Sequence, residues 1–241
     1  MRWILINGSP RGRRSNTLIL LERLAQGLAD TGHSTELLHI ALPSERALVV
    51  ERWTQAERLL LGFPLYADAM PGQVMELFEE LEGTCARPNS APIAFLVQSG
   101  FPEPGQSRVI ERWLGLFAKR LGARHIGTIV KGGMFGLQTL PAQKARKILQ
   151  CFEELGRQLG TNDRLDPKVL RKLCGPDWFP RWLRPVVRLV LSLSDDGNWN
   201  RKLKANGAFV HRYDQPYGCE VAQVHGDSAN PESRKETHAS L

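Results

Sequence analysis

Short apolar runs of strand length alternate with segments of helical periodicity, and this alternation constrains the fold more than any other feature of the sequence. Trp3-Ile4-Leu5-Ile6 is the first run, and residues 17–30 follow with leucine and alanine at helical spacing. The same patterns predict strands at residues 35–40, 58–63, 92–98 and 124–131, and helices at residues 44–55, 71–81, 106–121 and 141–159. Five buried strands joined by helices predict a parallel sheet covered on both faces, because a parallel connection needs a crossover.

The alternation stops near residue 160, which predicts a domain at residues 1–160 followed by an appendage. Residues 161–214 contain a helical pattern, an aromatic stretch broken by proline, and an apolar segment. We expect a helical extension there that packs on the domain or on a dimer partner, since its apolar side chains need cover. Residues 215–241 are polar, with few large apolar side chains, and this composition is typical of a disordered tail.

The composition, with 42% hydrophobic and 24% charged residues, is that of an ordinary globular protein. No uninterrupted apolar run approaches the roughly 20 residues that a membrane-spanning helix needs. The first residues, MRWILINGSP, lack the apolar region and cleavage site of a secretory signal. We therefore expect a cytoplasmic protein.

The positive charge is concentrated in the appendage. Residues 161–213 hold 11 Lys/Arg and 5 Asp/Glu, a net charge of +6 out of +7 for the whole chain. The domain itself is close to neutral, so we do not expect a nucleic acid partner. Cysteines and histidines are scattered, and neither a metal site nor a Ser-His-Asp constellation is indicated.

The loop at residues 7–17, Asn-Gly-Ser-Pro-Arg-Gly-Arg-Arg-Ser-Asn-Thr, lies between the first strand and the first helix. In a doubly wound sheet such a loop lies at the carboxyl edge, where backbone N–H groups and a helix N-terminus bind anions. We expect a phosphate there, held by Ser9, Arg11, Ser15, Asn16 and Thr17. The alternative is that the last three residues only cap the helix. The glycine spacing matches neither a dinucleotide-binding fingerprint nor a P-loop.

The chain resembles the NADPH-dependent FMN reductase-like family of the flavodoxin-like superfamily. The resemblance rests on Gly8-Ser9-Pro10-Arg11, on Ser15-Asn16-Thr17 entering a helix, and on residues 63–72, Phe-Pro-Leu-Tyr-Ala-Asp-Ala-Met-Pro-Gly. It implies a flavodoxin-like doubly wound α/β fold, with a five-stranded parallel sheet in the order 2-1-3-4-5. It also implies noncovalent FMN with NADPH or NADH as reductant.

By the same resemblance, the loop after the third strand holds the flavin ring, through Pro64, Leu65, Tyr66, Ala67 and Asp68. A third loop, Ser99-Gly100-Phe101, follows the fourth strand and is expected to border the ring, although a plain turn is an alternative. The glycine-rich segment 132–136 fits either substrate access or a simple turn.

These features predict an FMN-dependent NAD(P)H oxidoreductase that passes hydride to FMN and on to a small acceptor, such as a quinone, flavin, azo or nitro compound, or metal ion. The flavin supplies the chemistry, so we expect no catalytic side chain. The alternatives are a flavodoxin-like electron carrier and a non-catalytic flavin-binding regulatory module.

Apolar faces at residues 71–82 and 106–121 favour a homodimer, which the resemblance also implies. Arg181, Arg184 and Arg188 are spaced for one helical face beside apolar residues. Contact with a membrane surface is therefore an alternative to packing for this segment, and the less favoured one, because Pro185 interrupts it.

Overall fold

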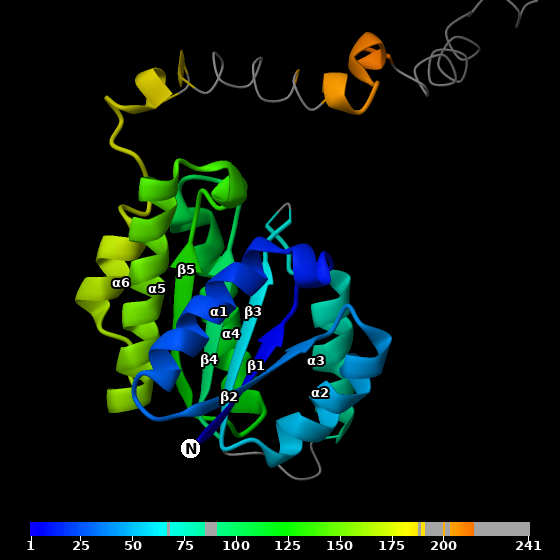
Figure 1. The fold of residues 1–241 in the computed structure, drawn as a ribbon, viewed down its shortest axis with the longest axis vertical. Coiled ribbons are helices and arrows are strands. Elements are labelled where there is room, and N and C mark those ends of the chain that lie inside the picture. The colour runs from blue at the N-terminus through cyan, green and yellow to red at the C-terminus, as the bar shows by residue number, and fades with distance from the viewer. Residues whose placement is uncertain (67, 85–90, 188, 191–199, 201–202, 215–241) are drawn as a thin grey trace, which may run out of the picture. The chain divides into compact units, whose positions relative to one another are not determined.

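The apolar runs form one parallel sheet with the strand order β2-β1-β3-β4-β5 in the computed structural model (Figure 1). The structure describes residues 1–66, 68–84, 91–187, 189–190, 200 and 203–214. The strands are β1 (Arg2–Asn7), β2 (Ser34–His39), β3 (Arg58–Pro64), β4 (Ile93–Gln98) and β5 (His125–Lys131). The α-helices are α1 (Asn16–Ala29), α2 (Pro43–Gln55), α3 (Gly72–Thr84), α4 (Arg108–Arg120), α5 (Ala142–Asn162) and α6 (Pro167–Cys174). The predicted fold class and strand order are thus confirmed.

Two hydrophobic cores lie on the two faces of the sheet, because alternate side chains of each strand point in opposite directions. Ile4 and Ile6 of β1 pack toward α2, α3 and α4, together with Leu61 of β3. Trp3 and Leu5 point to the other face, where α1, α5 and α6 cover the sheet (Figure 1). A doubly wound sheet of this kind leaves the carboxyl ends of its strands free to carry a ligand site.

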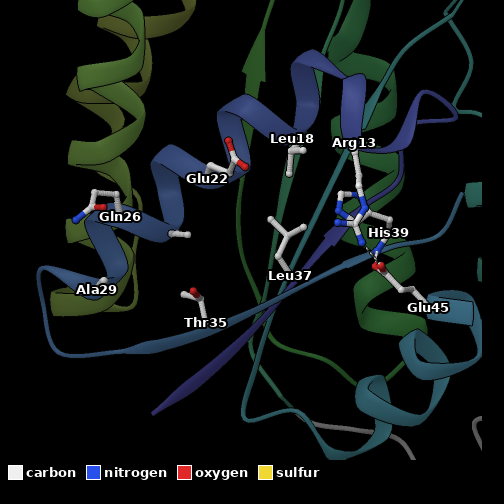
Figure 2. Close-up of a pocket in the computed structure, with 10 residues that line it drawn as sticks. Arg13, Leu18, Glu22, Gln26, Ala29, Thr35, Leu37, His39 and Glu45 are labelled. Carbon is white, nitrogen blue, oxygen red and sulfur yellow. Dashed lines mark hydrogen bonds and ion pairs between the residues drawn. The ribbon is translucent and has the colours of Figure 1, made fainter. Parts of the chain in front are cut away.

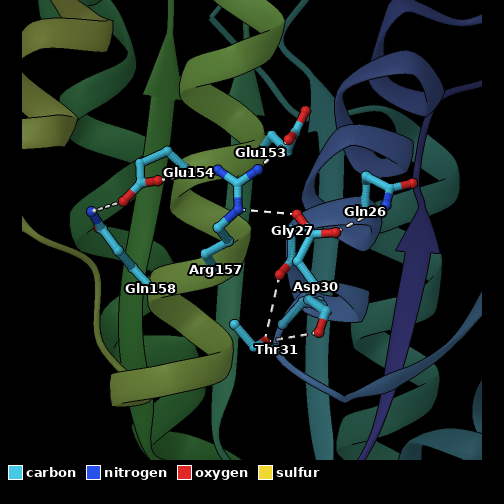
Figure 3. A network of polar contacts seen from close by, with 9 residues as sticks. Gln26, Gly27, Asp30, Thr31, Glu153, Glu154, Arg157 and Gln158 are labelled. Carbon is cyan, nitrogen blue, oxygen red and sulfur yellow. Dashed lines mark hydrogen bonds and ion pairs between the residues drawn. The ribbon is translucent and has the colours of Figure 1, made fainter.

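Helices α1 and α5 pack with their backbones in close contact. An ideal Cβ on Gly27 would lie 2.0 Å from the carbonyl oxygen of Glu153, and one on Gly156 would lie 2.3 Å from that of Leu24. Arg157 of α5 donates to Asp30 at 3.0 Å and also pairs with Glu153, which ties the exposed edge of this contact (Figure 3). The close packing of α1 on α5 therefore depends on glycine at the crossing.

The chain divides into two compact units, residues 1–179 and residues 180–241. In the first unit, α6 packs on α5 and β5, and its Leu173 and Cys174 are buried. In the second unit, a short 3-10 helix spans Phe209–His211, and Trp182, Val186, Leu189, Val190, Val210 and Tyr213 are exposed. Helical segments are thus present after the predicted domain, as expected. The packing of residues 180–214 on the domain or on a dimer partner stays a prediction. Arg188, Leu191 and the expected tail at 215–241 lie outside the described residues.

None of the helices in the described ranges combines the length and apolarity that crossing a bilayer requires.

Candidate functional site

Four loops meet at the carboxyl edge of the sheet, because the strands that precede them are parallel and adjacent (Figure 1). They are residues 8–15 after β1, 65–71 after β3, 99–107 after β4 and 132–141 after β5. Ligands of doubly wound sheets bind at this edge. The residues expected from sequence to hold the cofactor are on the first three of these loops or directly beside them.

The first loop is shaped by Asn7, the last residue of β1, whose side chain is fully buried. Its Nδ2 donates to the Gly12 carbonyl oxygen at 3.0 Å and lies 3.1 Å from the Ser15 hydroxyl. Its Oδ1 accepts from the backbone N–H of Ser9 at 3.1 Å. One amide therefore fixes both ends of the loop. Asn7 was not predicted as a site residue, and the available signal was a polar residue ending a buried strand.

Ser15 is the N-cap of α1. Its hydroxyl accepts from the backbone N–H of Leu18 at 3.1 Å and donates to the Gly12 carbonyl oxygen at 2.8 Å. The capping role considered from sequence is thus present. The first N–H groups of a helix have no acceptor within it, so those of Asn16 and Thr17 remain at the positive end of α1, available to an anion.

The side chains of Asn16 and Thr17 connect the first loop to its neighbours. Asn16 donates to the Met134 carbonyl oxygen at 2.6 Å and accepts from Gln138 at 2.8 Å. Thr17 is fully buried, and its hydroxyl accepts from Gln98 of β4 at 3.3 Å. These contacts show that the two side chains hold the loop against β4 and the loop after β5.

Positive charge surrounds the first loop. Arg11, Arg13 and Arg14 are exposed, and Arg13 pairs with Glu45 of α2 at 2.9 Å. In the part of the chain that the structure describes, no ion pair is seen for Arg11 or Arg14. An anion at the loop would therefore meet guanidinium groups as well as backbone N–H groups.

The loop after β3 is a tight turn that exposes an aromatic ring. The backbones of Tyr66 and Ala69 bond to each other in both directions, at 2.9 and 3.0 Å. Asp68 lies within the turn with a φ of 64°, a region that Asp tolerates better than most residues. The Tyr66 side chain is 49% exposed, whereas Leu65 is buried in the core. Leu65 can thus meet a ligand mainly through its backbone.

Pro64 ends β3 at the same edge, and Ala67 lies outside the described residues.

The loops after β4 and β5 are bonded into one unit. Ser99 donates its backbone N–H to Lys131 at 3.0 Å and accepts from that of Met134 at 2.8 Å. Phe101 accepts from the backbone N–H of Gly133 at 2.7 Å. An ideal Cβ on Gly132 would lie 2.4 Å from the Phe101 carbonyl oxygen. Glycine at 132 therefore serves the close approach of the two loops.

Three exposed aromatic rings come from three neighbouring loops: Tyr66, Phe101 and Phe135. Gly100 is beside them, and an ideal Cβ there would lie 3.4 Å from Cβ of Phe135. Exposed rings at a ligand-binding edge suit a flat aromatic ligand, which stacks on them. The edge thus combines the N-terminus of α1 at the first loop with exposed aromatic rings at the other loops.

Burial lowers the pKa of two titratable groups at this edge. Desolvation lowers the pKa of His39, at the carboxyl end of β2, from its ordinary 6.5. Desolvation likewise lowers the pKa of Lys131, at the carboxyl end of β5, while the nearby thiols of Cys174 and Cys151 act in the opposite direction. Neither residue was predicted from the sequence as part of the site, because burial at a strand end depends on the tertiary packing.

Comparisons with known proteins give a family match and similar folds. A family model described as NADPH-dependent FMN reductase matches residues 1–133. An NAD(P)H:quinone oxidoreductase from Methanothermobacter marburgensis superposes with a TM-score of 0.53 at 19% identity, covering 66% of this chain and 96% of that one. An NADH:FMN oxidoreductase gives a TM-score of 0.50 at 17% identity, covering 70% and 92%. At these identities the two structures support the fold alone. A search of curated proteins gave no match.

Proposed function

Because the chain belongs to the NADPH-dependent FMN reductase family, we propose that it passes electrons from NAD(P)H through FMN to a small-molecule acceptor bound at the carboxyl edge of the sheet. Membership makes the chain an NAD(P)H-dependent flavin oxidoreductase with FMN as its cofactor. The observation that carries the proposal is the pairing, at one edge, of the first turn of α1 with three exposed aromatic rings.

FMN fits the residues present at this edge. Its phosphate matches the free N–H groups of the first helical turn, and its flat ring matches the aromatic side chains. We assign the phosphate to the loop of Ser9, Arg11, Ser15, Asn16 and Thr17. We assign the ring to the loops that contain Pro64, Leu65, Tyr66, Ala67, Asp68, Ser99, Gly100 and Phe101.

Bound FMN supplies the redox chemistry, accepting hydride from the nicotinamide and passing electrons on. The protein then has to bind, orient and shield the reactants. The backbone N–H groups of Asn16 and Thr17 orient the phosphate end, and the exposed rings of Tyr66 and Phe101 exclude water from the flat end. This division of labour requires no general acid or base among the side chains.

The acceptor belongs to the class of quinones, free flavins, azo or nitro compounds and metal ions. The exposed rings of Tyr66, Phe101 and Phe135 favour the aromatic members of this class, because aromatic faces stack. A steady-state panel of these acceptors with NADPH and NADH tests this assignment. Turnover with an aromatic acceptor, such as a quinone or an azo compound, is expected, and turnover with metal ions alone would contradict the preference for aromatic acceptors.

A homodimer is proposed through a groove between α3 and α4. The groove has a volume of about 470 Å³, and its lining includes Met75, Phe78, Ile110, Trp113, Leu116 and Phe117. Trp113 stacks on Phe117 with ring centroids 5.1 Å apart, while the Leu116 side chain is 68% exposed. A pair of α-helices with such an apolar groove is suited to isologous contact with a second copy.

Reconstitution with FMN tests the proposed function. The apoprotein should quench FMN fluorescence stoichiometrically, and the complex should then consume NADPH or NADH in the presence of an acceptor. A protein that binds FMN but is not reduced by either nucleotide would be the electron carrier or regulatory module considered as alternatives. The cytoplasmic location and the expectation of no nucleic acid partner stay predictions.

A further inference from the structure

The orientation of the Asn7 amide is determined by two backbone groups. The Ser9 N–H can only donate, and it faces Oδ1 at 3.1 Å. The Gly12 carbonyl oxygen can only accept, and it faces Nδ2 at 3.0 Å. A flipped amide would place donor against donor and acceptor against acceptor. The Nδ2 group of Asn7 is therefore the one that faces β2.

The same Nδ2 lies 2.9 Å from Nδ1 of His39. His39 pairs with Asn7 in the register of β1 and β2, and its side chain is buried. Because Asn7 presents a donor, Nδ1 must accept. The His39 imidazole is therefore neutral and carries its proton on Nε2.

A groove between α1 and β2 reaches this imidazole. It has a volume of about 520 Å³ and is lined by Arg13, Glu22, His39 and Glu45 among others (Figure 2). Glu45 of α2 accepts the backbone N–H of His39 at 2.8 Å and pairs with Arg13 at 2.9 Å. Solvent in the groove can thus deliver a proton to the ring, although the ring is mostly buried.

We propose that Asn7 and neutral His39 are positioning residues that hold loop 8–15 in its phosphate-binding shape, and that protonation of His39 loosens this shape and weakens FMN binding. The inference rests on the proposed assignment of the FMN phosphate to this loop.

The physical reason is that an imidazolium donates from both ring nitrogens. The Nδ1–H of a protonated His39 would point at the Nδ2–H of Asn7, so two donors would face each other where a hydrogen bond now forms. The amide cannot flip, because Ser9 and Gly12 have fixed roles, so Asn7 must move and release them. The bonds lost are the ones that join the two ends of the loop.

The surrounding charges set the pH range. Desolvation lowers the pKa of His39 below 6.5, and Arg13 acts in the same direction, whereas Glu45 and Glu22 oppose it. Asn7 of β1 contributes no charge. The neutral form therefore predominates at pH 7, and the loosening is expected only as the pH falls below 6.5.

The test compares FMN dissociation constants at pH 7.5 and pH 5.0 by fluorescence quenching. The FMN phosphate itself titrates near pH 6, so every variant shows that contribution. His39→Asn replaces the Nδ1 acceptor with an amide oxygen that does not titrate. His125→Asn is the matched control, because His125 also has a pKa lowered by burial but lies at the opposite edge of the sheet.

The ratio of the FMN dissociation constant at pH 5.0 to that at pH 7.5 should be the same for the wild type and His125→Asn. For His39→Asn this ratio should be smaller by about tenfold, which is within the usual range of coupling between sites. Equal ratios in all three proteins would overturn the proposal. If the wild type failed to bind FMN at either pH, the proposed function would fail instead.

Nitrogen-15 NMR of the histidine side chains in the wild-type apoprotein provides a second readout that does not depend on a variant folding. The Nε2–H tautomer of His39 is expected at pH 7.5, with the midpoint of protonation below pH 6.5. An Nδ1–H tautomer, or an imidazolium at neutral pH, would refute the proposal even if FMN binds.

Discussion

Replacing Gly27 with alanine tests how strongly the α1 and α5 crossing constrains the fold. The two helices meet through Gly27 and Gly156, with an ideal Cβ on Gly27 only 2.0 Å from the Glu153 carbonyl oxygen. Carbon–oxygen contacts in packed helices lie at about 3.3–3.6 Å, so the helices must separate locally by about 1.3 Å.

The expected cost follows from the nature of the obstacle. Overpacking typically costs about 1–3 kcal/mol, and the upper end applies because backbone atoms have no alternative rotamer. Alanine in a helix returns about 1 kcal/mol relative to glycine. The net loss of unfolding free energy is therefore about 2 kcal/mol, which lowers Tm by about 4–8 °C in a chain of this size.

Thermal and urea unfolding followed by circular dichroism measure this change. Gly83→Ala is the matched control, because Gly83 is also helical but an ideal Cβ there meets no atom of the described residues within 4 Å. The control should be as stable as the wild type or more stable by up to about 1 kcal/mol. If Gly27→Ala gained stability as the control does, the reasoning about the helix crossing would be refuted.

Three further predictions address the site, the interface and acid stability. Ser15→Asp keeps an acceptor for the Leu18 N–H but sets a negative charge against a phosphate and loses the donor to the Gly12 carbonyl oxygen, so FMN affinity should fall by at least about tenfold; unchanged affinity in fluorescence titration would place the phosphate elsewhere. Leu116→Glu should convert the proposed dimer to a monomer in light scattering, and a monomeric wild type would contradict the interface. Burial lowers the folded-state pKa of His39 and His125 below 6.5. The unfolded chain therefore takes up protons first, and unfolding free energy should fall as pH drops below 6.5. Combining His39→Asn with His125→Asn should flatten this decline in urea titrations, and an unchanged slope would argue against it.

The helices and strands of the first unit could be predicted from the sequence, because their burial requires apolar residues at regular positions. Buried parallel strands are nearly continuous apolar runs, and the run 58–63 matches β3 to within one residue. The N-terminus of α1 was expected at Thr17 and lies at Asn16, one residue earlier, with Ser15 as the cap. The strand order required the resemblance to a family, because periodicity does not say which strands are neighbours.

The contacts within the site were less predictable. The Asn7 side chain contacts Ser9, Gly12 and His39. Only the folded chain brings His39, at the end of β2, beside the end of β1. A polar residue at a strand end carries too little local information to identify such partners. The hydrogen bond from Gln98 of β4 to the buried Thr17 hydroxyl is a further contact that the local sequence does not indicate.

Anaerobic stopped-flow mixing of the FMN-reconstituted protein with NADPH and with NADH tests the central claim most directly. The absorbance of oxidised flavin should bleach in a single phase whose rate saturates with at least one nucleotide, and adding a quinone should restore it. Bound FMN that stays oxidised with both nucleotides would contradict the account.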